Sequence, residues 1–464
     1  MNHSFRLKEI GPVPTRTSQE IRGSRIGIGF ETLDRELFNP ERCYDQLSQT
    51  GAKWARCQTG WNRCETVKGQ FDFQWLDDVV DNLLVRGIEP WFNVGFGNKL
   101  YMPDAPGEAA VGCVPVLYGP EAQEAWRLFL RKLTEHFKGR VRRYEIWNEA
   151  NHPGFWWPGK SSAKEYTQLV AMSAGEIKAV DPDAFISACS AGCACQFILD
   201  ALREGIGAHI GAFAIHPYST VPEMNYAEGV AALRSQFRQY APHVELWMGE
   251  CGCPSQTYGH NDEWLNLFNM DETKQAKWML RRLLTDLALG LEHVSYFHAT
   301  DLMEKEYRQA NGEVRKPVMT GLLHGKVYTP KEAFHSFAGI CSLFDAQTRP
   351  AALSCHCFAS LGRCESKLVE VAIKKLTFER NGYPLYAYYL PEDVQLETPV
   401  RNNIGLSILD DAPRKIDEPV LVDLLQMKVF AIESMKPGAW AFADIEGLPL
   451  ADYPLIITDR KALG

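Results

Sequence analysis

Short apolar runs of strand length alternate with longer amphipathic segments eight times from residue 24 onward. The expected strands are Arg25–Phe30, Lys53–Gln58, Trp91–Gly95, Arg142–Trp147, Ala184–Ser190, Ile210–Ile215, Val244–Gly249 and His293–His298. The expected helices are Glu41–Gln49, Trp75–Arg86, Glu121–Phe137, Ala163–Val180, Gln196–Glu204, Ala227–Tyr240, Glu272–Leu289 and Lys331–Phe344. Parallel strands need right-handed helical crossovers, and eight such units close efficiently. The alternation therefore predicts an α/β fold, a (β/α)8 TIM barrel.

An open, doubly wound sheet is the alternative arrangement for the same alternation. Such a sheet normally carries a glycine-rich phosphate loop after its first strand. The segment Gly27-Ile28-Gly29-Phe30-Glu31 lacks the third glycine and the start of a helix. The closed barrel is therefore favoured, and a dinucleotide cofactor is not expected.

The 464-residue chain is longer than one typical domain. After about residue 346, strand-like runs are separated by Gly, Pro, Asn and Asp; they are Leu368–Ile373, Tyr383–Leu390, Val420–Leu425 and Leu455–Thr458. We expect a catalytic barrel over residues 21–345 and an accessory C-terminal β-sandwich over 346–464. A strand from residues 1–20 could join the second unit.

Charge and hydropathy narrow the range of partners. The formal net charge is -9, and the densest basic stretch is the short segment 138–143, so nucleic acid is not an expected partner. The apolar segment Trp278–Leu291 is interrupted by Arg281, Arg282 and Asp286, so no membrane span is expected. A neutral or weakly charged carbohydrate fits this composition better. A homo-oligomer is compatible with the sequence, because the β-rich region offers a dimerisation surface.

Thirteen cysteines, an odd number, favour reduced thiols over a disulfide framework. Residues 1–11 include Arg6, Lys8 and Glu9 where a secretory signal would be apolar, so we expect a cytoplasmic protein. The spacings of Cys189, Cys193 and Cys195, and of Cys251 and Cys253, do not match paired Cys-x2-Cys zinc ligands. We therefore expect no metal and no other cofactor. A metal-assisted hydrolase is an alternative that elemental analysis would exclude.

Two glutamates follow strands that lie across the barrel mouth from each other. Glu149 ends the fourth strand and Glu250 ends the seventh, and barrel active sites lie at the carboxyl ends of the strands. Cleavage of a glycosidic bond requires one carboxyl group to protonate the leaving oxygen and another to meet the oxocarbenium-like carbon. We predict that Glu149 is the general acid/base and that Glu250 is the nucleophile.

The segments around these glutamates resemble the clan A glycoside hydrolases, particularly family 39, over residues 25–345. The segments that carry the resemblance are Tyr144-Glu145-Ile146-Trp147-Asn148-Glu149 with Asn151, Phe155-Trp156, Lys164-Glu165-Tyr166, Asp181-Pro182-Asp183, His216-Pro217-Tyr218, and Ser295-Tyr296-Phe297 with Asp301. Members of this family include β-xylosidases and α-L-iduronidases, and their mechanism is retaining.

The resemblance also implies roles for residues around the glutamates. Asn148 would bind the sugar 2-hydroxyl, His216 and Tyr218 would orient Glu250, and Arg56 would support the nucleophile. The residues agree with this, because each of these last three carries a hydrogen-bond donor at or just past a strand end.

Two residues depart from the family pattern. Gly249 stands where Thr is usual before the nucleophile, and Phe297 stands where a Trp commonly forms the floor of the sugar site. These departures leave the reaction class unchanged but leave the sugar undetermined.

Aromatic side chains near the strand ends are candidates for stacking on sugar rings. We predict that Trp156 and Tyr258 face the substrate and that Phe297 and His298 line its site. Trp91 and Trp247 lie within expected strands and are predicted to pack in the core.

These features predict a retaining O-glycoside hydrolase that acts by double displacement on a small oligosaccharide or glycoside. Among such enzymes, we favour an exo-acting, β-xylosidase-like glycosidase. The alternatives are a carbohydrate-binding protein on an inactive barrel and an endo-acting glycanase.

Overall fold

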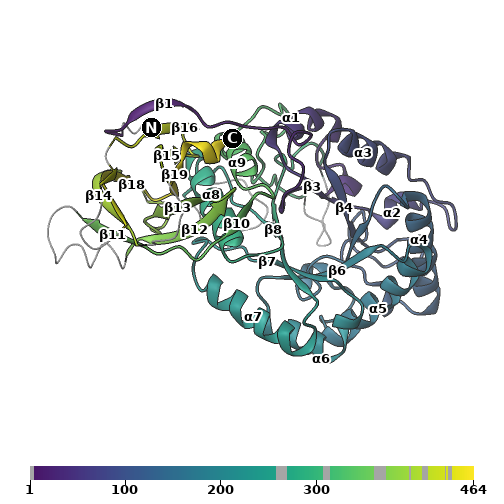
Figure 1. Ribbon diagram of the computed structural model, residues 1–464. Helices are drawn as coiled ribbons and strands as arrows, with labels where there is room; N and C mark the ends of the chain where they lie inside the picture. Colours follow the sequence, from purple (N-terminus) through teal and green to yellow (C-terminus); the bar gives the residue numbers. More distant parts are fainter. Residues whose placement is uncertain are drawn as a thin grey trace.

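The computed structural model describes residues 5–257, 269–306, 314–359, 372–396, 399–409, 416–433, 435–436 and 442–464. Eight parallel strands close into a barrel (Figure 1). In barrel order they are β2 (Ile26–Gly29), β3 (Trp54–Gln58), β4 (Glu89–Val94), β5 (Arg143–Ile146), β6 (Phe185–Ala191), β7 (Ala212–His216), β8 (Glu245–Cys251) and β9 (His293–Tyr296). Pairing of β2 with β9 closes the ring, with Gly27 opposite Ser295. The predicted barrel is confirmed.

Helices surround the barrel on its outside (Figure 1). They are α1 (Tyr44–Thr50), α2 (Trp61–Cys64), α3 (Gln74–Val85), α4 (Pro120–Phe137), α5 (Ala163–Val180), α6 (Cys195–Arg203), α7 (Tyr226–Tyr240), α8 (Glu272–Ala288) and α9 (Glu332–Leu343). The expected helix Glu41–Gln49 is instead a 3-10 turn over Pro40–Arg42 followed by α1. The side chain of Asn39 caps that turn by accepting from the Glu41 N–H.

Aromatic rings fill the barrel interior. Trp91 of β4 and Trp247 of β8 are 0% and 2% exposed, and their rings meet edge to face with centroids 5.2 Å apart. His293 of β9 packs against both rings. The prediction that these two tryptophans serve packing is confirmed.

The C-terminal region forms two antiparallel sheets. One has the order β1 (Lys8–Pro12), β16 (Lys428–Ala431), β15 (Pro419–Asp423), β19 (Leu455–Asp459), β13 (Tyr383–Tyr389), β12 (Lys374–Arg380) and β10 (Thr348–Pro350). The other has the order β11 (Cys355–Ala359), β14 (Arg401–Ile408), β18 (Ala443–Leu450) and β17 (Met435–Lys436). The expected sandwich-like character is confirmed, and β1 pairs with β16 at the edge of the larger sheet.

One expected C-terminal strand differs from the structure. Leu368–Ile373 falls mostly outside the described residues, and the strand in this region begins afterwards, at Lys374.

Helix α8 joins the barrel to the larger sheet through buried charged side chains. Lys277 forms a 2.9 Å ion pair with Asp452, and Arg281 forms a 2.7 Å ion pair with Glu223. Tyr389 of β13 donates to the same Glu223. Arg281, one of the charges that interrupt the apolar segment Trp278–Leu291, is therefore paired where α8 meets the larger sheet.

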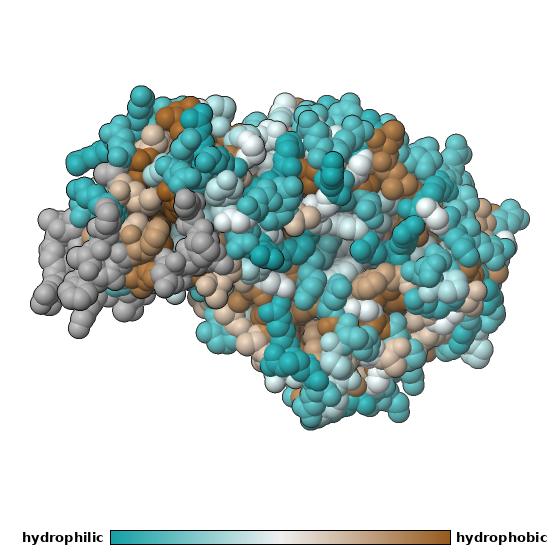
Figure 2. All heavy atoms as spheres, viewed as in Figure 1, coloured by the Kyte–Doolittle hydropathy of each residue, from teal (hydrophilic) through white to brown (hydrophobic). Residues whose placement is uncertain are grey.

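The surface view shows mostly hydrophilic side chains, with smaller hydrophobic patches between them (Figure 2). Among the described residues, no helix has the length and apolar character needed to cross a membrane.

Candidate active site

Glu149 and Glu250 meet at the carboxyl end of the barrel, with His216 between them. Glu149 follows β5, Glu250 lies near the end of β8, and His216 ends β7. One donor atom from each of the three residues lies within 4.8 Å of the other two. A carboxylate oxygen of Glu149 is therefore within that distance of one from Glu250.

The backbone around Glu149 takes up an unusual conformation. Trp147 and Glu149 have φ angles of 70° and 42°, in the left-handed region that non-glycine residues rarely adopt. The amide of Asn93 donates to the Trp147 carbonyl at 2.6 Å, and the Glu149 N–H donates to the sulfur of Cys189 at 3.2 Å. Neighbouring strands thus hold a strained turn, and such strain clusters at functional sites.

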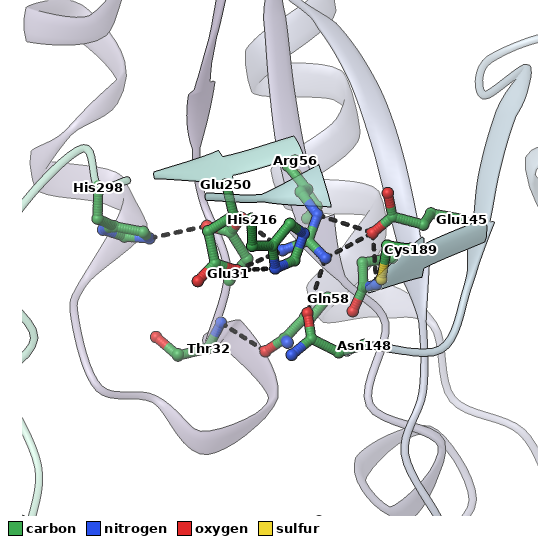
Figure 3. Close-up of polar contacts among 12 residues, drawn as sticks. Glu31, Thr32, Arg56, Gln58, Glu145, Asn148, Cys189, His216, Glu250 and His298 are labelled. Atoms are coloured by element: carbon green, nitrogen blue, oxygen red, sulfur yellow. Dashed lines mark hydrogen bonds and ion pairs between the residues drawn. The ribbon is translucent and has the colours of Figure 1, made fainter. Parts of the chain in front are cut away.

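Arg56 donates hydrogen bonds to Glu250 and to three other side chains around it (Figure 3). Its Nη1 donates to Glu31 and to Glu250, each at 2.9 Å. Its Nε donates to Glu145 at 2.9 Å, and its Nη2 donates to Glu145 and, at 2.8 Å, to Asn148. These bonds use all five N–H donors of a guanidinium. Burial acts to lower the pKa of Arg56, but Glu145, Glu31 and Glu250 together hold it well above its ordinary value.

Both oxygens of Glu250 have donors. The Tyr218 hydroxyl donates to Oε1 at 2.8 Å, and Arg56 donates to Oε2 at 2.9 Å. Burial, together with the charge of Glu250, raises the pKa of Tyr218 well above its ordinary value, so Tyr218 keeps its proton. Two fixed donors favour an ionised carboxylate, which is the form a nucleophile needs.

His216 lies between the two glutamates and contacts Glu149 more closely than Glu250. Its Nδ1 lies 2.9 Å from Oε1 of Glu149 and 3.8 Å from Oε2 of Glu250. The ring lies closer to Glu149 but also contacts Glu250, so the expectation that His216 orients Glu250 stays a prediction. Burial lowers the pKa of His216 to about 4, so the ring is neutral at neutral pH.

Gly249 makes room for this arrangement. A Cβ at Gly249 would lie 2.9 Å from the Cβ of Ala214 and 3.2 Å from Nε2 of His216. The Thr that is usual in the family would not fit without displacing the imidazole. This departure in the sequence therefore matches the position of His216.

The sequence reasoning missed Glu31, which follows β2. Its side chain is buried, and its Oε1 accepts from Arg56. Burial raises the pKa of Glu31 to about 8, with Glu250 adding to the rise and Arg56 opposing it. Its place just after a strand, like that of the other two glutamates, was the available signal.

Thr32 and Gln58 were also missed. The Thr32 N–H donates to Oε1 of Gln58 at 3.0 Å, which fixes the amide at the end of β3 (Figure 3).

Trp156 does not face the substrate site. It is only 1% exposed, and its ring packs edge-on against Tyr166 of α5. The prediction of a substrate-facing Trp156 is therefore wrong, because the side chain turns into the protein after the 3-10 turn Pro153–Phe155. The next residue, Trp157, is 45% exposed.

The eighth strand also differs in part from expectation. His298 is fully buried, and its ring packs against those of Phe38 and Phe297. The prediction that His298 lines the substrate site is wrong, because neighbouring rings enclose it. Phe297 is 8% exposed, and its role stays a prediction. Tyr258 lies outside the described residues.

Two groups of side chains offer donor atoms at metal-binding distances in the described part of the chain. One is the group of Glu149, His216 and Glu250. The other contains Glu145, Cys189 and His216. Burial raises the pKa of the Cys189 thiol well above its ordinary value, which disfavours the thiolate that binds zinc. All the described cysteines are free thiols.

Comparison with known proteins agrees with this geometry. Residues 49–204 match the model of the glycosyl hydrolases family 39, and this segment includes Arg56, Asn148 and Glu149. The chain is 30% identical over 129 residues to a beta-xylosidase of Geobacillus stearothermophilus, and this alignment covers 25% of this chain and 24% of that protein. It is 31% identical over 126 residues to a beta-xylosidase of Caldicellulosiruptor saccharolyticus, covering 24% of each. The chain thus spans about a quarter of the length of these curated relatives.

Among solved structures, a family 39 glycoside hydrolase from the gut symbiont Bacteroides cellulosilyticus WH2 superposes with a TM-score of 0.67. The superposition covers 97% of this chain and 83% of that one at 17% identity, so it supports the fold. The resemblance to family 39 that the motifs predict is therefore confirmed, over residues 49–204 for the family model.

Proposed function

We propose that the protein is a retaining glycoside hydrolase with Glu250 as nucleophile and Glu149 as general acid/base. The observation that carries this proposal is the approach of the two carboxylates, whose nearest oxygens lie within 4.8 Å. Retaining enzymes separate their carboxyl groups by about 5–5.5 Å, whereas inverting enzymes need about 6.5–9.5 Å to admit a water. The close approach favours direct attack.

The surrounding contacts suit the two steps of double displacement. In the first step Glu149 gives its proton to the leaving oxygen while Glu250 attacks the anomeric carbon. In the second step Glu149 takes a proton from water, which displaces Glu250 from the sugar. His216, neutral and 2.9 Å from Glu149, can hold that carboxyl group in place through both steps.

The sugar 2-hydroxyl is the natural partner of Asn148. Arg56 holds the amide oxygen of Asn148 at 2.8 Å, which leaves the amide N–H groups as donors for a ligand. Hydrogen bonds to the 2-hydroxyl strengthen in the transition state, so a fixed amide there contributes to catalysis.

For the substrate we propose a small β-xyloside or a related short oligosaccharide, cleaved from its end. Support comes from the local similarity to two beta-xylosidases and from the match of residues 49–204, which include Asn148 and Glu149, to the family 39 model. A cytoplasmic location belongs to the same proposal, because the buried free thiols Cys57, Cys189 and Cys251 near the site suit a reducing compartment.

A panel of nitrophenyl glycosides tests the proposal. We expect hydrolysis of at least one β-glycoside, and loss of activity by at least about a thousandfold in Glu250→Gln. Glu149→Gln should keep activity on substrates with good leaving groups and gain activity with azide. The matched control is Glu121→Gln, which replaces an exposed carboxyl group and should leave activity unchanged. An active Glu250→Gln protein would refute the assignment, and a binding protein on an inactive barrel would show no hydrolysis across the panel.

A further inference from the structure

Glu31 and the proposed nucleophile share one nitrogen of Arg56. Nη1 carries two hydrogens, and it donates one to Oε1 of Glu31 and the other to Oε2 of Glu250, each at 2.9 Å. The other three donors of the guanidinium are occupied by Glu145 and Asn148. Neither glutamate can therefore accept a second hydrogen bond from Arg56 unless another of the residues bound to Arg56 loses one.

The charges around Arg56 do not balance if every carboxyl group is ionised. Glu31, Glu145 and Glu250 all contact this single cation, and burying an uncompensated charge is costly. Glu145 accepts from Arg56 and from the Asn93 amide, and Glu250 accepts from Arg56 and Tyr218. The ionised forms of these two glutamates are thus the better supported.

Glu31 has the weakest support for a negative charge. Arg56 is the side-chain donor to its Oε1, and its Oε2 is buried without a hydrogen-bond partner among the described residues. Nε2 of His298 lies 3.6 Å from that oxygen, beyond hydrogen-bond distance.

Two further ionisable side chains near Glu31, Cys57 and His298, are held neutral. Cys57 of β3 is buried, and burial raises its thiol pKa well above the ordinary value. His298, which follows β9, has its pKa lowered to about 3 by burial. Arg56 lowers and Glu250 raises the pKa of Glu31, so these two charges act on it in opposite directions.

We propose that Glu31 is a positioning residue for the nucleophile Glu250. Glu31 acts in its protonated, neutral form, so that the positive charge of Arg56 pairs with the carboxylate of Glu250. The proposal rests on the role of Glu250 given above. A neutral carboxyl group is a weaker acceptor than a carboxylate, so Nη1 stays with Glu250. An ionised Glu31 would compete for that nitrogen and add a like charge beside the nucleophile.

This arrangement links the proton of Glu31 to the charge of Glu250. Burial and the negative charge of Glu250 both raise the pKa of Glu31, which reaches about 8. Any change that removes the charge of Glu250 should therefore make Glu31 more acidic, as expected for coupled carboxyl groups.

Infrared difference spectroscopy of the full-length protein between about pH 5 and about pH 9 tests the proposal. We expect a protonated-carboxyl C=O band at neutral pH that is lost on deprotonation near pH 8 and is absent from Glu31→Gln. In Glu250→Gln the same band should disappear at lower pH. Glu121→Gln, which lacks an exposed carboxyl group, is the control and should keep the wild-type band. A wild-type protein whose Glu31 is already ionised at neutral pH would overturn the proposal, and so would a titration unaffected by Glu250→Gln.

Kinetics provide the second readout on whichever glycoside is cleaved. Gln mimics a protonated Glu, so Glu31→Gln should keep kcat within about threefold of wild type near neutral pH. Above about pH 8, the kcat of this variant should decrease less than the kcat of wild type. Glu31→Ala leaves a hydrogen of Nη1 without its acceptor and should lower kcat by about tenfold or more. Equal losses in the Gln and Ala variants would contradict the role of the protonated form. The infrared result needs no turnover, so a protein that cleaves no glycoside would refute the proposed function while leaving Glu31 testable.

Discussion

The phenol oxygen of Tyr218 lies 2.8 Å from Oε1 of Glu250 and donates a hydrogen bond to it, while Arg56 holds the other oxygen. The loop that carries Tyr218 is fastened from α8, since Arg282 donates to the Pro222 carbonyl at 2.6 Å and Trp278 donates to the Ser219 carbonyl at 3.0 Å. The position of Glu250, the proposed nucleophile, thus depends on a helix that also contacts the C-terminal sheet.

Removal of the Tyr218 hydroxyl tests this support. Tyr218→Phe deletes one of two donors to a charged group, a change worth about 1.5–3 kcal/mol. We expect kcat/KM to fall by about one to two orders of magnitude with little change in thermal stability. Tyr240→Phe, at an exposed tyrosine, should behave as wild type. Unchanged kinetics in Tyr218→Phe would show that the hydrogen bond does not support Glu250.

Loss of Arg56 should affect stability as well as activity. Arg56→Ala leaves Glu145 and Glu31 buried without their cation, and breaking a buried ion pair costs about 3–5 kcal/mol. We expect the free energy of unfolding in urea to fall by about that amount. Adding Glu145→Gln to Arg56→Ala should recover part of the loss, because the uncompensated charge is then removed. A free energy of unfolding equal to that of wild type would contradict the role of Arg56 in compensating these buried charges.

The two neighbouring tryptophans should respond differently to truncation. Trp156→Ala empties a buried site and should lower the free energy of unfolding by about 3–5 kcal/mol. Trp157→Ala removes a side chain that is 45% exposed and should change stability by about 0.5 kcal/mol or less. Thermal or urea denaturation of the pair measures the contrast. The reverse order of stabilities would mean that Trp157 is the packed ring.

Buried neutral histidines should make the fold sensitive to acid. Burial lowers the pKa of His216 to about 4 and the pKa values of His293 and His298 to about 3. The unfolded chain takes up these protons below about pH 6.5 while the folded chain does not, so stability decreases as pH falls through this window. Each group contributes up to about 1.4 kcal/mol per pH unit. Glu31 and Asp286, whose pKa values burial raises to about 8 and about 6, act in the opposite direction.

A single substitution isolates one of these contributions. His293→Asn removes one titrating ring, so its free energy of unfolding should decrease less steeply than that of wild type as the pH falls from about 6 to about 4. The two slopes should differ by about 1.4 kcal/mol per pH unit. Urea denaturation at several pH values measures both slopes. Parallel slopes would show that His293 is not held neutral.

Periodicity was sufficient to predict the barrel, because alternation of short apolar strands with amphipathic helices is a local property of the chain. The helix Ala163–Val180 begins and ends where its pattern predicts, with Ser162 capping its first turn. Glu149 and Glu250 could be identified as candidates from their places at strand ends. The sequence did not predict that Glu31 and Glu250 share Arg56, because this contact depends on how the side chains are oriented inside the barrel.

Burial explains the errors at aromatic and histidine positions. Trp156 and Trp157 are adjacent and chemically identical, so the sequence does not reveal which ring turns inward. His298 ends an expected strand and His216 directly follows one, yet His298 is enclosed by phenylalanine rings while His216 contacts Glu149. Packing partners that are distant in sequence decide these cases.

The stereochemistry of the first product distinguishes retention from inversion at the anomeric carbon. Proton NMR of the reaction mixture on a cleaved aryl β-glycoside, recorded within the first minutes, distinguishes the anomers before mutarotation. The close approach of Glu149 and Glu250 predicts that the β-anomer of the sugar forms first, with net retention through a covalent intermediate on Glu250. Initial formation of the α-anomer would contradict the account, because a single inverting displacement would then carry the reaction.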